Sequence, residues 1–151
     1  KENMNNKGFS LVELIIVIAI MAILIVVLAP QYLKYVERSR NSTDLQNART
    51  IMTAVETYAA DPQATKAILD TEKVEVKVTS AGASLTSDSA DGAGAQGIAD
   101  AGLTLSDIKC SSKTKWKEYT LIGTMQSNGA IKWTFTSDPA NNFANAMAGK
   151  S

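Results

Sequence analysis

The chain has 151 residues, 45% of them hydrophobic, and its 15 basic and 15 acidic side chains give a formal net charge of zero. This length fits one small domain with an added segment better than two domains. Balanced charge provides no strong field for nucleic acid, so we expect no specific nucleic-acid partner. The sequence has no histidine and one cysteine, which excludes Ser-His-Asp and Cys-His catalysis, His-based metal sites and an intrachain disulfide. We expect neither enzyme activity, nor a cofactor, nor a metal.

An apolar segment near the start of the chain organises the rest. From Phe9 to Ala29 it is apolar except for Ser10 and Glu13. At about 1.5 Å of rise per residue, a helix of this length crosses a hydrocarbon core of ~30 Å, which predicts a membrane span at residues 9–30. A carboxyl group in such a span costs roughly 2.5–3.5 kcal/mol. Glu13 therefore needs a positive partner that it meets inside the apolar phase.

Residues 7–14, KGFSLVEL, resemble the class III signal of type IV prepilins and pseudopilins, and Pro30 lies where many members of this family also have a proline. The resemblance covers residues 7–60. It implies that prepilin peptidase cuts after Gly8, removes residues 1–8 as a cytoplasmic leader, and methylates the new amino terminus at Phe9. It also implies that Glu13 attracts this amine on a neighbouring subunit during assembly.

Two simpler interpretations of the apolar segment are a secretory signal peptide and an ordinary single-pass anchor. A secretory signal has a shorter apolar region that is removed by a cut behind it, whereas here the cut would precede the region. An ordinary anchor explains the length, but not the Gly8–Phe9 junction or Glu13. The positive-inside rule gives little help, because basic residues also follow the span at Lys34, Arg38 and Arg40. The orientation rests mainly on the family resemblance.

We expect one long helix from Phe9 to Ala60, with a transmembrane first half and an amphipathic second half. Pro30 removes a backbone donor from this helix and crowds the preceding turn, which predicts a kink. Beyond it, apolar residues recur at intervals of three and four, as on one face of a helix. They include Leu45, Ala48, Met52, Val55 and Ala59. This second half should therefore support a soluble domain.

The middle of the chain carries weaker signals. Asp61-Pro62 is typical of a helix start, so we expect a short helix that ends near Asp70. Strict alternation predicts a half-buried strand over residues 72–79. Residues 80–102 are rich in Ser, Ala, Gly and Asp and poor in large apolar groups. We interpret them as a surface loop, with at most a helical turn around residues 98–101.

The clearest sheet signal lies near the end of the chain. Residues 116–125 and 130–136 are rich in aromatic and β-branched residues, and an Asn-Gly turn joins them as a hairpin. Ile131, Trp133 and Phe135 should face the helix. We interpret Trp116 and Trp133 as core residues rather than as a carbohydrate platform. A last short helix, capped at Asp138-Pro139, should bring Phe143, Ala146 and Met147 to one side.

Three further patterns are weak. Asp88, Asp91 and Asp100 lack the ordered spacing of a calcium-binding EF-hand loop. The glycines at 92, 94 and 97 match a dinucleotide-binding pattern, but we expect neither the strand before it nor a strong helix after it. Lys109 and Lys113 flank Cys110 and could lower its pKa, yet a buried, unreactive thiol fits better.

We therefore predict an α+β fold, in which a long N-terminal helix packs against a small antiparallel sheet with short helices. The predicted domains are a leader at residues 1–8, a transmembrane or filament-core helix at 9–30, and a globular head at 31–151. The lone cysteine departs from the disulfide-closed loop of many pilins. This departure favours a Gram-positive pilin or a pseudopilin, and the chain resembles a clostridial-type major pilin without the disulfide loop.

The resemblance implies a structural subunit of a type IV pilus that serves adhesion, surface (twitching) motility or aggregation. Its implied partners are identical subunits in a helical homopolymer, prepilin peptidase, the pilus assembly platform and its ATPase, and the cytoplasmic membrane. The subunit would cross that membrane once before assembly and lie in an extracellular filament afterwards. The alternatives are a pseudopilin of a type II secretion or competence DNA-uptake system, and a membrane-anchored enzyme or binding module.

Overall fold

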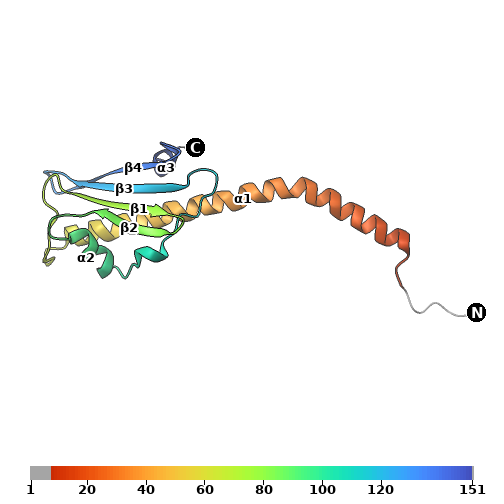
Figure 1. Cartoon of the computed structure of the whole chain (residues 1–151), viewed down its shortest axis with the longest axis horizontal. Helices are drawn as coiled ribbons and strands as arrows, with labels where there is room; N and C mark the ends of the chain where they lie inside the picture. The colour runs from red at the N-terminus through yellow and green to blue at the C-terminus, as the bar shows by residue number, and fades with distance from the viewer. Residues whose placement is uncertain (1–7, 151) are drawn as a thin grey trace, which may run out of the picture. The chain divides into compact units, whose positions relative to one another are not determined.

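A computed structural model describes residues 8–150 and divides them into two compact units, which meet between Val36 and Glu37. Helix α1, Leu11–Ala60, runs from the first unit into the second (Figure 1). This helix confirms the predicted long N-terminal helix within two residues at its start. Pro30 lies inside α1, and the helix continues through it. The kink that we expected at this proline stays a prediction.

The unit that begins at Glu37, called the head below, contains a four-stranded antiparallel sheet in the order β2-β1-β3-β4. The strands are β1 Lys73–Thr79, β2 Gly82–Ser87, β3 Glu118–Met125 and β4 Ile131–Asp138, and the shorter helices are α2 Ala93–Asp100, the 3-10 helix η1 Leu105–Asp107 and α3 Asn142–Met147. Within the head, the sheet lies along the second half of α1 (Figure 1). The predicted α+β fold is confirmed.

The core of the head lies between one face of α1 and one face of the sheet. The helix contributes buried side chains at intervals of three and four, namely Ala48, Ile51, Val55 and Tyr58. Every second residue of β1 and β3 is buried against them, as the period of two of a strand requires. Ile131, Trp133 and Phe135 of β4 also pack against this core, as predicted, while the residues between them are exposed.

An aromatic cluster fixes the carboxyl-terminal helix. Phe143 of α3 stacks on Tyr119 with the ring centroids 4.1 Å apart, and it meets the edges of Trp116 and Phe135. The predicted inward position of Phe143 and the burial of Trp116 are confirmed. The predicted cap is wrong, because α3 begins at Asn142. Instead, the Ser137 hydroxyl donates to the carbonyl of Pro139 and accepts from the N–H of Phe143, which holds the residues between them in a turn.

The short helix predicted after Asp61-Pro62 is absent, and this prediction is wrong. Turns replace it. The side-chain carboxylate of Asp61 accepts a hydrogen bond from the N–H of Gln63, and the backbone carbonyl of Asp61 accepts one from the N–H of Ala64. The Glu72 carboxylate then binds the N–H groups of Leu69 and Ala90. A segment this short gains little from helix formation, because nucleation is unfavourable. These local hydrogen bonds and the burial of Ile68 determine its path.

Residues 80–102 correct a second prediction, because they form β2 and α2 rather than a surface loop. Their small side chains allow close packing that large apolar groups would prevent. A Cβ atom at Gly97 would lie 2.8 Å from Cβ of Tyr58 and 3.2 Å from the carbonyl oxygen of Ala54, both on α1. One at Gly94 would lie 2.7 Å from Cγ1 of Val74 on β1. The two glycines therefore allow α2 to approach both α1 and the sheet.

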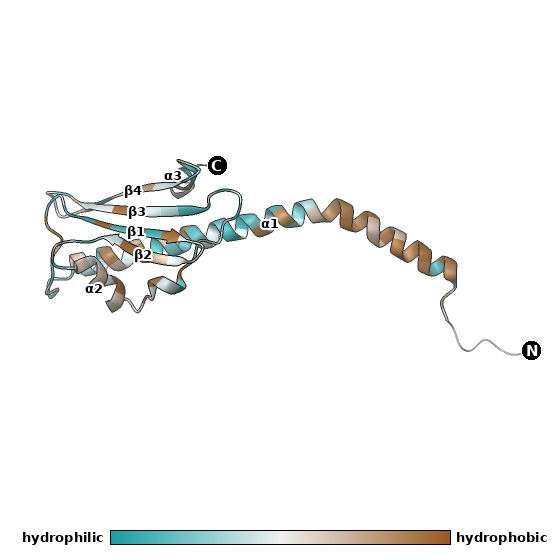
Figure 2. Ribbon diagram, in the orientation of Figure 1, coloured by the Kyte–Doolittle hydropathy of each residue, from teal (hydrophilic) through white to brown (hydrophobic). Residues whose placement is uncertain are grey.

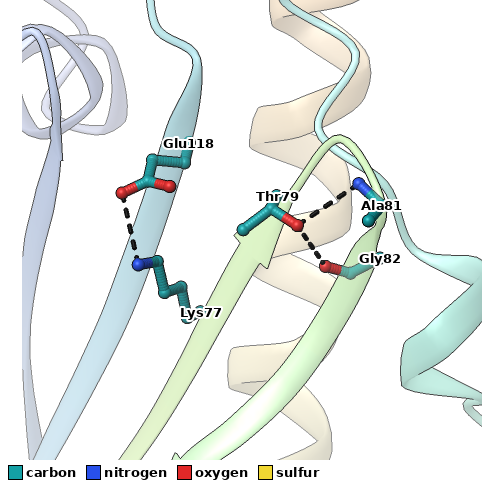
Figure 3. A network of polar contacts seen from close by, with 5 residues as sticks. All are labelled: Lys77, Thr79, Ala81, Gly82 and Glu118. Carbon is teal, nitrogen blue, oxygen red and sulfur yellow. Dashed lines mark hydrogen bonds and ion pairs between the residues drawn. The ribbon is translucent and has the colours of Figure 1, made fainter.

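The sheet face that points away from α1 is polar. An ion pair joins Lys77 of β1 to Glu118 of β3 at 3.3 Å (Figure 3). At the end of β1 the Thr79 hydroxyl donates to the carbonyl of Gly82 and accepts from the N–H of Ala81, which closes the turn into β2. The ion pair is half exposed, so it contributes little to stability. The turn fixes the register of the edge strand.

Replacing Gly97 with alanine tests the close packing of α2 on α1. In an exposed helix this change would stabilise the protein by about 1 kcal/mol. Here the added methyl group overpacks the contact with Tyr58, so we expect the free energy of unfolding to fall by about 1–3 kcal/mol. Denaturant unfolding in detergent, followed by circular dichroism, measures the change. The matched control is Ala99→Val at an exposed position of α2, and equal stability of the two variants would contradict the packing argument.

Candidate functional site

The predicted processing and assembly residues lie at the start of α1. Gly8 and Phe9 precede the helix, and the Phe9 side chain is 83% exposed. The Ser10 hydroxyl oxygen accepts a hydrogen bond from the N–H of Glu13 at 3.2 Å, so Ser10 caps the helix. Glu13 lies in the first turn, where the positive end of the helix dipole favours a carboxylate. The Gly8–Phe9 bond is thus outside the helix.

The cap at Ser10 was not predicted from the sequence, where Ser10 was noted only as a polar residue in the apolar segment. The Ser-x-x-Glu spacing of Ser10 and Glu13 is the signal that could have revealed it, since this spacing is typical of a helix start. The cap gives the helix a defined first turn.

The first half of α1 is apolar on every side. Its large apolar side chains from Leu11 to Leu28 are each about half exposed or more, and Figure 2 shows hydrophobic residues along this part of the helix. By length and composition, α1 is the one helix in residues 8–150 that could cross a membrane. A helix that is hydrophobic all round is stable in water only when other apolar groups cover it. This segment therefore requires lipid or other helices around it.

In the head, the most constrained polar group is the carboxylate of Asp44, on the buried face of α1. Its side chain is fully buried. It accepts hydrogen bonds from the N–H groups of Ser111 and Ser112 at 2.7 and 2.9 Å, and from Nε1 of Trp116 at 2.8 Å. Such donors compensate the loss of water around a buried charge. Asp44 thereby ties the segment before β3 to α1.

Glu37 repeats this arrangement two turns earlier in α1. Its carboxylate accepts hydrogen bonds from the N–H groups of Lys113 and Thr114 and from the Ser112 hydroxyl. Burial raises the pKa of this carboxyl, but the hydrogen bonds from Lys113, Thr114 and Ser112 outweigh burial and lower the pKa overall. Together, Glu37 and Asp44 bind consecutive backbone N–H groups. The loop therefore follows the helix closely along this length.

Cys110 lies beside Asp44, and its Sγ donates to Oδ2 of Asp44 at 3.5 Å. The thiol is 5% exposed. Burial, together with the charge of Asp44 and the hydrogen bond to it, raises the pKa of Cys110 to about 12. The predicted burial of Cys110 is confirmed, and the raised pKa agrees with the unreactive thiol that we predicted.

Asp88 occupies the place where a phosphate would bind in a glycine-rich loop. Its carboxylate accepts hydrogen bonds from the N–H groups of Ser89, Gly94 and Ala95, so the amino end of α2 already carries an anion. Contrary to our expectation, strand β2 precedes the glycines at 92, 94 and 97, and Gly94 and Gly97 lie inside helix α2. These glycines allow α2 to pack closely, and the Asp88 side chain caps the amino end of α2.

The three acids that we considered for calcium serve different purposes. Asp88 caps α2, and Asp100 accepts a hydrogen bond from the side-chain amide of Gln96 at 2.8 Å. Asp91 is exposed. In the described part of the chain, no group of three or more acidic or cysteine side chains is close enough to hold a metal ion.

Comparisons with known proteins agree on the amino-terminal segment. The prokaryotic N-terminal methylation motif matches residues 3–29. The type IV major fimbrial protein FimA of Dichelobacter nodosus is 44% identical over 55 residues, which cover 36% of this chain and 35% of that protein. The chain thus spans about a third of the length of the Dichelobacter relatives that it matches. No solved structure matches the chain.

A longer similarity extends through the head. The fimbrial protein EcpC of Eikenella corrodens is 32% identical over 132 residues, which cover 87% of this chain and 83% of that protein. The chain belongs to the type IV pilin family. The prepilin peptidase-dependent protein A of Clostridium perfringens is 33% identical to this pilin over 81 residues, covering 52% of the pilin and 54% of that protein. This match and the single cysteine support the clostridial-type resemblance.

Pilins are structural proteins, and the relatives bear the names of fimbrial subunits rather than of enzymes. In the pilin head, the buried carboxylate of Asp44 binds backbone N–H groups and stabilises the fold. The role of Asp44 was not predicted from the sequence. The available signal was the position of Asp44, three to four residues from apolar residues on the buried face of the helix. An acid at such a position needs buried hydrogen-bond donors.

Removing the Asp44 carboxylate tests its structural role. Asp44→Ala leaves the buried donors of Ser111, Ser112 and Trp116 without an acceptor, so we expect the free energy of unfolding to fall by about 3–5 kcal/mol. Thermal unfolding in detergent, followed by near-ultraviolet circular dichroism, reports this loss through the aromatic cluster. The matched control is Asp91→Ala at an exposed site, where we expect a change within about 0.5 kcal/mol. Equal midpoints for the two variants would refute the role of Asp44.

Proposed function

We propose that this pilin is the structural subunit of a type IV pilus. Prepilin peptidase cuts it after Gly8 and methylates Phe9, and the mature subunits polymerise into a helical filament through the apolar first half of α1. Residues 1–8 act as leader, residues 9–30 as membrane anchor and filament core, and residues 31–151, which include the head, as the globular domain. The filament serves adhesion, surface motility or aggregation.

One observation carries this proposal: an apolar helix that is exposed on every side carries one acid in its first turn and follows an exposed Gly8–Phe9 bond. In the membrane, lipid covers the helix. In a filament, the same helices of neighbouring subunits cover one another, so one surface suits both states. Because lipid is already apolar, cohesion comes from close packing and from the polar groups that the packing buries.

Glu13 supplies the polar interaction. Cleavage gives Phe9 a cationic amine at the positive end of the helix dipole, which is unfavourable for a cation. A carboxylate from the adjacent subunit would neutralise this amine, and each group would otherwise be a lone charge in an apolar core. The pairing sets the axial register of the subunits. Processing and assembly of this kind require four partners: identical subunits, the peptidase, the assembly platform and its ATPase.

Mass spectrometry of the amino-terminal peptide tests the processing step. Filaments sheared from producing cells and pelleted should yield a peptide that begins at N-methylated Phe9. Gly8→Ser is the control, because it should block the cut and leave the leader attached in the membrane fraction. A methylated peptide found in membranes alone would favour a pseudopilin. An intact leader on all of the wild-type protein would refute processing after Gly8.

Replacing Glu13 with alanine tests the pairing with Phe9. Loss of one partner from a buried ion pair costs about 3–5 kcal/mol at each contact, so we expect filament yield to fall by more than about tenfold. Insertion into the membrane should be unchanged or improved, because the variant helix is wholly apolar. Immunoblots of sheared and membrane fractions measure both quantities. Glu13→Asp keeps the charge as a control, and normal filament yield from Glu13→Ala would exclude the pairing role.

A further inference from the structure

The loop that leads into β3 concentrates positive charge. Residues 108–117, IKCSSKTKWK, contain four lysines and no acid. Lys109, Lys113, Lys115 and Lys117 are all exposed. In the described residues none of these four lysines forms an ion pair. Their charge therefore faces solvent.

The structure explains why these side chains point outward. The backbone N–H groups of Ser111, Ser112, Lys113 and Thr114 bind the carboxylates of Glu37 and Asp44. The main chain of the loop thus faces α1, and the lysine side chains extend away from it. A fixed loop loses less conformational freedom when it meets a partner than a flexible one does.

Arg40 extends the positive charge onto the helix. It lies three residues after Glu37 and four before Asp44, so it shares their side of α1, and its side chain is exposed. We call these five residues, Lys109, Lys113, Lys115, Lys117 and Arg40, the basic patch. Among the acids near it, Glu37 and Asp44 bind the loop, and Asp138, whose carbonyl accepts a hydrogen bond from the N–H of Lys117, is exposed. Glu118 pairs with Lys77.

The basic patch follows the membrane segment closely along the chain. Arg40 is ten residues beyond Pro30 in the same helix, which corresponds to about 15 Å of helix. Tyr32 and Tyr35 lie in this interval and are each 67% exposed, and tyrosines are enriched where a helix leaves a bilayer. The potential of an anionic membrane surface acts over about 8–10 Å. Lys113 of the loop binds Glu37, which is seven residues beyond Pro30 along the chain, so part of the basic patch is nearer to the membrane segment in sequence than Arg40 is.

We propose that the basic patch binds the phosphate headgroups of anionic phospholipids while the subunit waits in the membrane. This inference rests on the membrane-anchored state under the proposed function. Lysines spaced by two to four residues along an exposed loop form a broad charged surface, which suits a layer of headgroups better than one enclosed ligand. The patch holds the head at the membrane surface until assembly withdraws the subunit, and this contact is then lost.

Lysine acetylation of the full chain in lipid nanodiscs tests the proposal. Discs of phosphatidylcholine, with or without phosphatidylglycerol, are treated with an N-hydroxysuccinimide acetate ester, and mass spectrometry gives the rate at each lysine. With phosphatidylglycerol we expect the four lysines of the patch to react about fivefold more slowly. Lys73 and Lys132 are internal controls, since both pair with Thr124 at the opposite end of the sheet. Their rates should not change.

Charge reversal gives a second readout. In Lys113→Glu/Lys115→Glu, Lys109 and Lys117 should react in phosphatidylglycerol discs as they do in phosphatidylcholine discs. The matched variant Lys73→Glu/Lys132→Glu should keep the protection. Both pairs of substitutions are at exposed positions, so the fold is retained. High salt should remove the protection in the wild type as well.

Each other outcome overturns the proposal for a distinct reason. Equal rates in both kinds of disc, with the chain inserted, would leave membrane anchoring intact and refute lipid binding by the patch. Slow reaction in phosphatidylcholine discs supplied with soluble glycerol phosphate would show that free anions bind. A chain that does not enter the discs would refute the anchoring itself, and the lipid contact with it.

Discussion

Asp44 places a carboxylate inside a helix–sheet interface that is otherwise apolar, where an unpaired charge would be very unfavourable. The segment before β3 supplies the N–H groups that compensate it. Trp116 is one of these donors and also contacts Phe143. The Asp44 carboxylate therefore links the aromatic cluster and the loop to α1. The strand that follows then starts at a defined place beside the helix. Packing alone would leave the path of this loop less determined.

Periodicity predicted most of the fold. The interval of three and four in α1, the alternation in β1, and the Asn-Gly turn between β3 and β4 all depend on local side-chain order, which a sequence displays directly. The edge strand β2 and helix α2 were missed because their order depends on tertiary contacts: β2 pairs with β1, and Gly97 allows α2 to approach α1. Small residues give no hydrophobic pattern, yet they permit backbones to pack closely.

The residues of the candidate site also differ in how readily the sequence reveals them. Gly8, Phe9 and Glu13 were predicted because they belong to one short pattern in the sequence, and this pattern is shared with a family. Asp44 was missed because its donors come from residues 111–116, more than sixty positions later. An acid on a helix face has the same appearance in a sequence whether water or buried N–H groups surround it. Only the fold shows which of these environments it has.

Helix α1 carries acids in three environments, and the donors available to each decide its role. Asp44 and Glu37 meet N–H groups of their own chain, so their charges stabilise the head. Glu13 lies in the apolar segment, where the described residues offer its side chain no such donors, and its carboxylate is free to meet the amine of another subunit. The head is thus complete within one chain, whereas the amino-terminal segment is not. In the proposed filament, a neighbouring subunit supplies both the apolar cover and the positive charge that this segment lacks.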